Sequence, residues 1–481
     1  MRVAVLGGGM GGLSAAWELA RQGHQVTVYQ TGWRLGGKGA SGREAQFQQR
    51  IHEHGLHVLM GFYDQAFTLL RDVYAEAHKA PTFPNGKPLP WANAVEGWDT
   101  CVFSRQRSGG AWSFFDVDFP PAAGNPWDGV RPSPDFTDLF KAGVQVLLAI
   151  YAQLKGLIAN PWLDAAVEAA IKALLAIAGA LTAAMRLTLA AGLQKALGLV
   201  IATVINAGSL KSERDEWLFI AFCFAAANAL GMLRDDLVKP SPDFASIDHY
   251  DYRDWLGSAL DPTGCPDWAS RQSPFVTALY DLAFSRERTL AAGVTLKVLL
   301  RLGLHYRGHL SFRMAAGMGD IVFAPFYIAL KQQLGVQFRF FHRVKALRLD
   351  AGKTRIDSVE IERQVGQWNG YDPLVDVNGL ACWPHEPKTA LLDAAYQGDY
   401  AAAGNVMPYD FERDPAPSKY RPENTFTITR GTDFDVVVLA IPVGAHAPVR
   451  GDLIAAHPGF RDHGRQPADH SAPPPCRCGS D

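Results

Sequence analysis

The chain has 481 residues, of which 48% are hydrophobic and 20% are charged, and its formal net charge is −2. This length allows two or more domains with ample core. A net charge so near zero argues against a nucleic-acid-binding protein. The cysteines have no regular spacing that would predict a disulfide framework; they stand at positions 101, 223, 265, 382, 476 and 478. No signal peptide precedes the first predicted strand, so the expected compartment is the cytoplasm.

The N-terminus predicts a strand, a glycine turn, a helix and a second strand. The apolar segment 3–6 leads into a turn that carries glycines at 7, 9 and 12, with further glycines at 8 and 11. In the spacing G-x-G-x-x-G, the first glycine allows a tight turn, the second lets the backbone approach a pyrophosphate, and the third brings helix and strand together. The anion would lie on free N–H groups at the helix N-terminus. Gly23 predicts the helix end, and residues 25–29 predict the second strand.

The end of the second strand departs from the usual pattern. An acidic residue normally stands at this position and accepts hydrogen bonds from the ribose hydroxyls. Here the residue is Gln30, whose amide oxygen can still accept a hydrogen bond but carries no negative charge. Arg34 follows closely, so this feature alone leaves NADP open as the ligand. A second glycine turn comes next and is predicted to give a longer cofactor access to the backbone; it consists of Gly36 and Gly37, followed by Lys38.

These segments resemble the FAD-dependent amine oxidase and phytoene desaturase superfamily, and within it the carotenoid desaturase branch. The residues that carry the resemblance are 7–30, 34–38, 53–58 and 61–63. The resemblance implies an FAD site formed by Gly7, Gly9, Gly11, Gly12, Gln30, Arg34, Gly36, Gly37, Lys38, Gly55, Leu56 and His57. Glu53 is expected beside the cofactor with His57.

Three later segments resemble the same family more weakly. Residues 317–320, with Pro325 and Leu330, are similar to the stretch where the chain re-enters the cofactor domain. Residues 336–338 and 343–347 are then expected to be a strand pair, and the backbone of Val344 is expected to contact adenine. Residues 435–442 are similar to the late strand beside the cofactor.

The resemblance implies an α/β fold with a Rossmann-like FAD-binding domain and an interleaved helical and β substrate domain. We expect the FAD-binding domain to comprise residues 1–80, 310–350 and 433–450. The substrate domain is expected over 81–309 and 351–432, with strands near 356–361 and 425–428. No segment after Ile441 matches the family's last cofactor motif, which suggests a truncated product. Residues 457–481 are rich in proline and are expected to be a disordered tail.

The middle of the chain, 136–237, is predicted to be helical and strongly apolar. Charged residues such as Lys172, Arg186 and Lys195 interrupt its apolar runs, which argues against a transmembrane span. Two alternatives stay open. The helices form a buried substrate domain, or they form an interfacial lid that contacts lipid and admits an apolar substrate.

Few side chains suggest catalytic chemistry. His52, Glu53, His54 and His57 do not have the H-E-x-x-H spacing, and no further ligand is identifiable, so no metal is predicted. Asp116 and Asp118 are expected to share one exposed strand face. Four tryptophans are more simply explained by core packing than by a pocket; they are Trp91, Trp98, Trp112 and Trp127.

The expected function is an FAD-dependent oxidoreductase that dehydrogenates or desaturates a lipophilic, polyisoprenoid-like substrate by hydride transfer to flavin, with catalytic residues unidentified. The alternatives are a flavin amine or amino-acid oxidase, or an inactive remnant that binds dinucleotide weakly. The expected partner is a lipophilic small molecule and not a nucleic acid. Peripheral contact with a membrane stays open.

Overall fold

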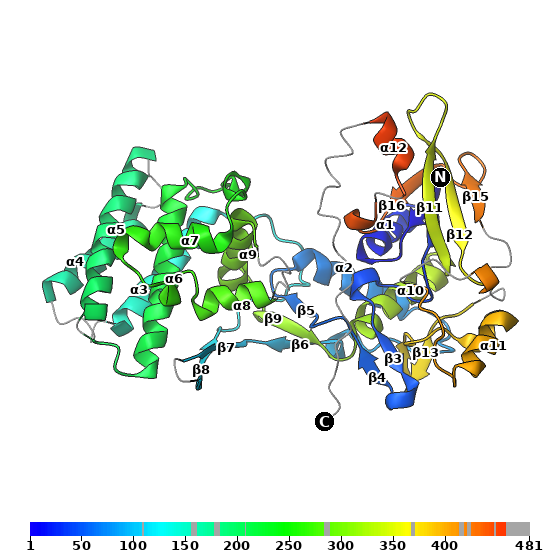
Figure 1. Ribbon diagram of the computed structural model, residues 1–481, viewed down its shortest axis with the longest axis horizontal. Coiled ribbons are helices and arrows are strands. Elements are labelled where there is room, and N and C mark those ends of the chain that lie inside the picture. The colour runs from blue at the N-terminus through cyan, green and yellow to red at the C-terminus, as the bar shows by residue number, and fades with distance from the viewer. Residues whose placement is uncertain are drawn as a thin grey trace. The chain divides into compact units, whose positions relative to one another are not determined.

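A computed structural model describes residues 1–457 apart from short internal gaps (Figure 1). The gaps are 108–109, 155–160, 178–182, 207, 283–288, 367–370, 413–417, 421–424 and 447–448. The predicted tail, from residue 458 onward, therefore lies outside the described residues. The chain forms two compact units: residues 1–58, 69–96 and 313 onward make the first, and residues 59–68 and 97–312 make the second.

The first unit contains a parallel sheet with the strand order β10-β2-β1-β16. Its strands are β1 (Arg2–Leu6), β2 (Gln25–Tyr29), β10 (Gln337–Arg339) and β16 (Val436–Leu439). The predicted first two strands are thus confirmed, and the predicted late strand pairs with β1 in the register Val3↔Val436. Two central strands rich in valine suit a sheet that is covered on both faces.

One face of this sheet is next to helices. Helix α1 (Met10–Arg21) follows the glycine turn and contacts β1. A second, wholly buried helical segment continues from Gly319–Phe323 through α10 (Ala324–Ile328). The Trp17 ring of α1 meets the Phe326 ring edge-on at 6.3 Å. The segment expected to re-enter the cofactor domain therefore packs on the helix that follows the glycines.

The other face packs on an antiparallel sheet with the order β11-β12-β15, visible in Figure 1. These strands are β11 (His342–Leu349), β12 (Ile356–Arg363) and β15 (Thr425–Thr429). Ala4 and Leu6 share one apolar cluster with Val359, Ile361 and Ile428.

This packing corrects the predicted domain division. Residues 351–432 were expected in the substrate domain, and they belong to the same compact unit as the parallel sheet. The reason is the hydrogen bonding between strands, because β12 pairs with β11 and β15 pairs with β12 in one antiparallel sheet. Strands were correctly predicted near 356–361 and 425–428.

Small elements complete the first unit. They are the paired strands β3 (Gly42–Glu44) and β4 (Arg50–His52), the paired strands β13 (Val375–Val377) and β14 (Leu380–Cys382), and the helices α11 (Ala394–Ala402) and α12 (Gly451–Ala456). The chain passes from one unit to the other within β5 (Val58–Met60), α2 (Asp64–Ala77), β6 (Val95–Trp98) and β9 (Ser311–Met314).

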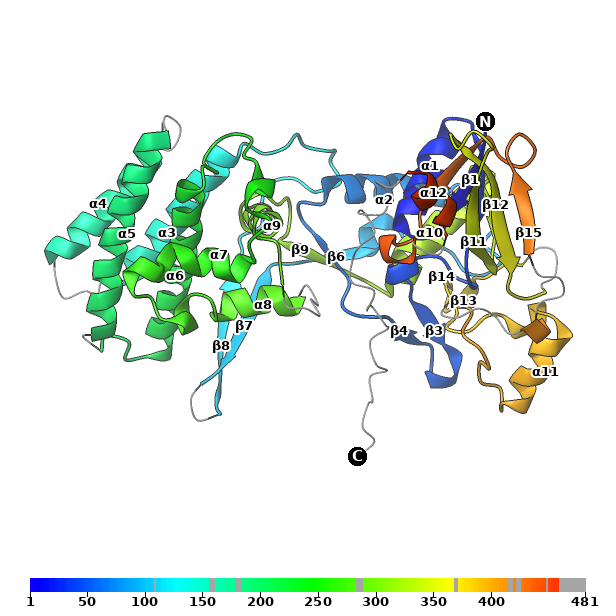
Figure 2. The same cartoon turned by 45° about the horizontal axis from the view of Figure 1, so that its top comes forward.

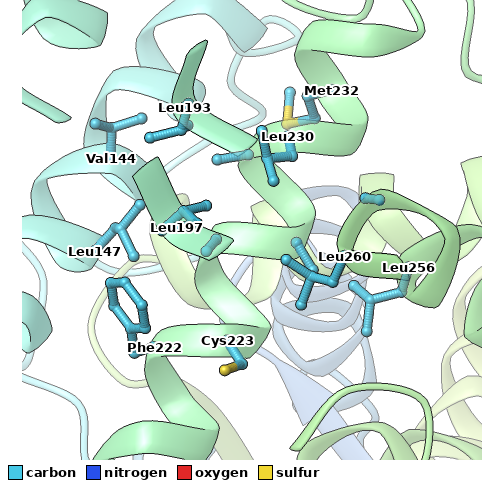
Figure 3. Packing of buried hydrophobic residues seen from close by; sticks show 14 of the residues in the cluster. Val144, Leu147, Leu193, Leu197, Phe222, Cys223, Leu230, Met232, Leu256 and Leu260 are labelled. Carbon is cyan, nitrogen blue, oxygen red and sulfur yellow. The ribbon is translucent and has the colours of Figure 1, made fainter. Parts of the chain in front are cut away.

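The second unit is mainly helical, as the sequence predicts for 136–237. Its helices are α3 (Phe136–Leu154), α4 (Pro161–Ile177), α5 (Ala183–Asn206), α6 (Glu213–Arg234), α7 (Tyr252–Leu260), α8 (Pro274–Leu282) and α9 (Ala292–Leu304). Figure 3 shows side chains from α3, α5, α6 and α7 meeting in one apolar cluster, among them Leu147, Leu197, Phe222 and Leu256. The helices therefore surround a continuous hydrophobic core.

Among the residues that the structure describes, two helical segments are long and apolar enough to cross a membrane by length and composition alone: Leu187–Asn206 and Glu213–Arg234. The apolar window of the second is 72% buried inside its unit, as in the core helix of a globular domain, whereas that of the first is 28% buried. Burial of α6 against its neighbours accounts for its composition without lipid.

The second unit also contains the antiparallel hairpin of β7 (Thr100–Gln106) and β8 (Trp112–Asp118), drawn clearly in Figure 2. Asp116 and Asp118 share its exposed face, as expected. Core packing does not explain Trp112 and Trp98, which are 60% and 49% exposed. It holds for Trp127, whose ring meets that of Phe67 at 5.8 Å.

Replacement of Leu197 by alanine should destabilise the helical unit strongly, because the side chain is fully buried in the cluster of Figure 3. We expect a loss of about 2–5 kcal/mol in the free energy of unfolding, measured by urea denaturation followed by circular dichroism. Leu199→Ala on the same helix, where the residue is 53% exposed, is the control and should change it by less than about 0.5 kcal/mol. Equal losses in the two variants would contradict the packing.

Candidate functional site

The first glycine turn connects β1 to α1. The backbone at Gly7 has a φ of +114°, a conformation that favours glycine, and its N–H donates to the Tyr29 carbonyl at 2.9 Å. A Cβ on Gly12 would lie 1.9 Å from the Gly7 carbonyl oxygen. Gly12 therefore lets α1 begin directly against the strand end, which is the role the motif predicts for the third glycine.

Gly9 stands at the N-terminus of α1, where a side chain would meet no close contact. A Cβ there would have no atom nearer than the Gly36 oxygen and the Gly37 Cα, both 3.9 Å away. The first hydrogen bond inside the helix is donated by Leu13 to the Gly9 carbonyl at 3.0 Å. The N–H groups before Leu13 thus precede the helical ladder and point from the positive end of the helix dipole. This arrangement suits an anion.

The second glycine turn lies against the first. Gly36 donates its N–H to the Gly8 carbonyl at 2.9 Å, and a Cβ on Gly37 would lie 3.4 Å from the Gly9 Cα. A side chain on Gly36 would collide with the ring of Phe323, at 2.8 Å. Lys38 and Gly11 are both exposed beside these turns. The two turns together form one surface of accessible backbone.

Gln30 lies at the carboxyl end of β2, where a ribose-binding residue is expected. Its amide oxygen accepts the Gly8 N–H at 2.7 Å, and its amide nitrogen donates to the Thr31 carbonyl at 2.5 Å. The residue is buried, at 8% exposure. Gln30 therefore supports the glycine turn directly, and its oxygen keeps one further lone pair for a ligand hydroxyl.

Arg34 is buried and engaged by a carboxylate. Its Nε and Nη2 donate to the two oxygens of Glu412 at 2.8 and 2.7 Å, a bidentate pair. The guanidinium also lies over the Trp33 ring, 5.3 Å from its centre. The sequence left Arg34 open as a partner for a phosphorylated ribose, and it did not indicate Glu412.

The segment 53–57 is tied to the turn at 317–320. Glu53 accepts the Met318 N–H at 2.5 Å with one oxygen and lies 3.1 Å from Nδ1 of His57 with the other. The Met318 sulfur lies 3.0 Å from the Cβ position of Gly39, just after the second glycine turn. Gly55 is half-buried and Leu56 is 68% exposed. Glu53 and His57 thus stand near the second glycine turn, whereas the Leu56 side chain faces solvent.

A buried ion pair, which the sequence does not indicate, holds this region together. Arg43 donates from Nε to Asp320 at 2.9 Å, and Asp320 is 1% exposed. Burial raises the pKa of Asp320, against the lowering effect of the Arg43 charge. Ser41 accepts the Gly319 N–H at 2.7 Å. The only sequence signal for this pair is the glycine-flanked position of Asp320.

Both strands predicted within 336–347 form, but the prediction that they pair with each other is wrong. β10 joins the parallel sheet beside β2, whereas β11 joins the antiparallel sheet. The backbone between them turns at Phe341, whose φ is +58°. Val344 pairs with Ile361 beside an irregularity in the register. His342 at the start of β11 donates its backbone N–H to the Gln30 carbonyl at 2.8 Å, so β11 starts at the end of β2.

Comparison with known proteins identifies relatives of the N-terminal segment. Residues 5–73 match the model of the NAD(P)-binding Rossmann-like domain family. Over 79 residues the chain is 42% identical to zeta-carotene desaturase of Solanum lycopersicum, an alignment that covers 16% of this chain and 13% of that protein. It is 31% identical over 122 residues to 15-cis-phytoene desaturase of Synechococcus elongatus, which covers 25% of this chain and 22% of that protein.

Among solved structures, a putrescine oxidase bound to putrescine aligns over 75% of this chain and 54% of that chain, at 13% identity and a TM-score of 0.33. An oxidoreductase from Methanosarcina mazei aligns over 75% of this chain and 56% of that chain, at 13% identity and a TM-score of 0.30. The sequence relatives confirm the predicted resemblance over the N-terminal segment, and the matched segment spans 13% of the length of the tomato enzyme.

His342 should make the first unit sensitive to acid. Burial lowers its pKa from 6.5 to about 4, although its Nδ1 lies 2.6 Å from the Phe340 carbonyl, which opposes the shift. The native state holds the imidazole neutral, so stability is complete above pH 6.5 and is lost as pH falls toward 4. The difference corresponds to about 3 kcal/mol.

We expect His342→Gln to flatten this dependence between about pH 7 and pH 4.5, measured from urea midpoints. His249→Gln, at an exposed position, is the control and should keep the wild-type slope. A slope in His342→Gln as steep as in the wild type would disprove the assignment.

Proposed function

We propose that this chain, whose N-terminal segment belongs to the NAD(P)-binding Rossmann-like family, is an FAD-dependent oxidoreductase that acts on a lipophilic, polyisoprenoid-like substrate. The observation that carries the proposal is the pair of glycine turns, joined by the hydrogen bond from Gly36 to Gly8. One turn at the start of α1 suits a pyrophosphate. The second turn packs against the first and adds further backbone for a ligand to contact. A ligand longer than a mononucleotide could contact both turns.

The charges around Gln30 favour FAD over NADP. A 2′-phosphate needs a free cation near the ribose, and Arg34, which the sequence left open for that role, is paired with both oxygens of Glu412. Gln30 is neutral, and its amide oxygen can accept a hydrogen bond from a ribose hydroxyl. Its side chain carries no charge that would attract or repel a phosphate. The residues present thus fit a dinucleotide with an unphosphorylated adenosine ribose.

The chain's own residues would bind and orient the cofactor. The N–H groups at the start of α1 would hold the pyrophosphate, Gly9 would leave room for it, and Gln30 would lie on the adenosine side. Glu53 and His57 would lie toward the second glycine turn. When bound, the flavin accepts a hydride from the substrate, so the protein supplies position and exclusion of water more than acid or base.

The substrate class is supported by the relatives and by the second unit. The matched relatives are named as desaturases of zeta-carotene and phytoene. In the second unit, one face of the β7–β8 hairpin packs on the helical core, where the Phe115 ring stacks on Trp217 at 5.2 Å. The opposite face exposes Trp112 and Phe114, at 60% and 62%. Exposed aromatic side chains on a hairpin suit contact with a membrane surface, from which an apolar substrate would be taken.

Gly9→Ala should abolish FAD binding without unfolding the chain. The added methyl group would lie 3.9 Å from the Gly36 oxygen and the Gly37 Cα, an ordinary contact that the fold can accept, and it would narrow the space assigned to the pyrophosphate. We expect affinity for FAD to fall at least about 100-fold, measured by quenching of flavin fluorescence during reconstitution, because a bound phosphate and a methyl group cannot share this space.

Gly398→Ala on α11 is the matched control, since a Cβ there meets nothing within 4 Å and the position is remote from both turns. It should bind FAD like the wild type. NADPH is titrated in parallel. Unchanged FAD binding in Gly9→Ala would overturn the site, and tight binding of NADPH in place of FAD would overturn the cofactor.

The membrane contact is tested by flotation with phosphatidylcholine vesicles. The double variant Trp112→Ser/Phe114→Ser should bind vesicles at least about tenfold more weakly than the wild type, because two aromatic side chains no longer enter the interface. Phe47→Ser, at a residue of the first unit that is 60% exposed, is the control. Equal flotation of the double variant and the wild type would reject the hairpin as the contact.

A further inference from the structure

We propose that Glu44, His52 and His385 form a binding site for a divalent transition-metal ion such as Zn²⁺. Glu44 and His52 lie on β3 and β4 of the first unit, and His385 lies in a bend beside β3. One ligand atom from each residue lies within 4.8 Å of the other two. None of these residues belongs to the two glycine turns, and the proposal does not depend on the proposed flavin chemistry.

The backbone brings the three residues together in a regular way. Strands β3 and β4 pair with Gly42 opposite His52 and Glu44 opposite Arg50, so Glu44 and His52 are diagonal neighbours on one face. On the other edge of β3, Arg43 donates its N–H to the Trp383 carbonyl at 2.7 Å and accepts the His385 N–H at 2.9 Å. His385 thus lies beside the strand that carries Glu44.

The close approach of His385 requires a glycine. A Cβ on Gly42 would lie 2.6 Å from the His385 Cα. Without a side chain at this position, the two imidazole rings come to 4.3 Å between centroids, with 45° between their planes. The His52 ring already forms an ion pair with the Glu44 carboxylate. The three side chains therefore converge on one point.

The donor set is the one that zinc and related ions prefer. Two imidazoles and one carboxylate are the protein ligands of several catalytic zinc sites and of non-haem iron sites. Nδ1 of His385 is buried and has no hydrogen-bond partner among the described residues. A metal ion bound through this nitrogen would give it the partner that it lacks.

The charges around the site permit a cation. Arg34, which is near His385, is neutralised by Glu412, and Arg43 is neutralised by Asp320. Arg50 is exposed opposite Glu44, and Glu386 adds a carboxylate next to His385. The His52 side chain is 45% exposed, so water can complete the coordination. Three protein ligands with an open side are typical of a site that binds a further ligand.

The test uses the full chain after treatment with EDTA. Zn²⁺ is titrated by calorimetry, and Co²⁺ is added separately because its visible absorption reports the coordination geometry. Both titrations are repeated in a Cys476→Ser/Cys478→Ser background, so that these two thiols cannot supply ligands. The ligand variants are Glu44→Gln, His52→Ala and His385→Ala. His54→Ala, an exposed histidine close to His52 in the sequence, is the control.

We expect one ion per chain and an affinity that falls at least about 100-fold in each ligand variant, since loss of an outer partner alone commonly costs 10–100-fold. The control should bind like the wild type. The proposal is overturned if the chain binds no ion, if His385→Ala binds as tightly as the wild type, or if the His54→Ala control loses the ion. Circular dichroism of each variant separates loss of a ligand from loss of the fold.

Discussion

The organisation of the first unit depends on the contact between the start of α1 and the end of β1. A Cβ on Gly12 would lie 1.9 Å from the Gly7 oxygen, so no other residue permits this approach without moving the helix. Because α1 starts so close to the sheet, its first N–H groups reach the strand ends, where Gly36 also bonds to Gly8. Parallel strands place their carboxyl ends on one edge, and ligands of such sheets bind there.

Distant segments reinforce this edge through polar contacts that are largely buried. Gln30 bonds to Gly8, Glu412 holds Arg34, and Asp320 holds Arg43. Each contact gives a polar or charged group a hydrogen-bond partner, because a buried polar group left without one costs about 1–3 kcal/mol, and a charged group costs more. The same hydrogen bonding that extends β3 to the segment at 383–385 also brings His385 beside Glu44. Support of the glycine turns and formation of the proposed metal site thus come from one part of the fold.

The two units divide the physical tasks. The first presents backbone and polar groups at a sheet edge, whereas the second buries large apolar side chains among helices and exposes aromatic residues on the β7–β8 hairpin. A cofactor that performs the electron transfer needs few catalytic side chains.

The sequence by itself determined the local features of this protein. The strand–turn–helix–strand unit, the second glycine turn and the helices over 136–237 each follow from short-range patterns, because glycine spacing and apolar periodicity act within a few residues. Only the tertiary structure decided which remote partners meet. It placed 351–432 with the parallel sheet, gave Arg34 the carboxylate of Glu412, and brought His385 to His52. These outcomes depend on strand pairing and side-chain contacts between segments that are separate in the sequence, and no local pattern specifies which of them meet.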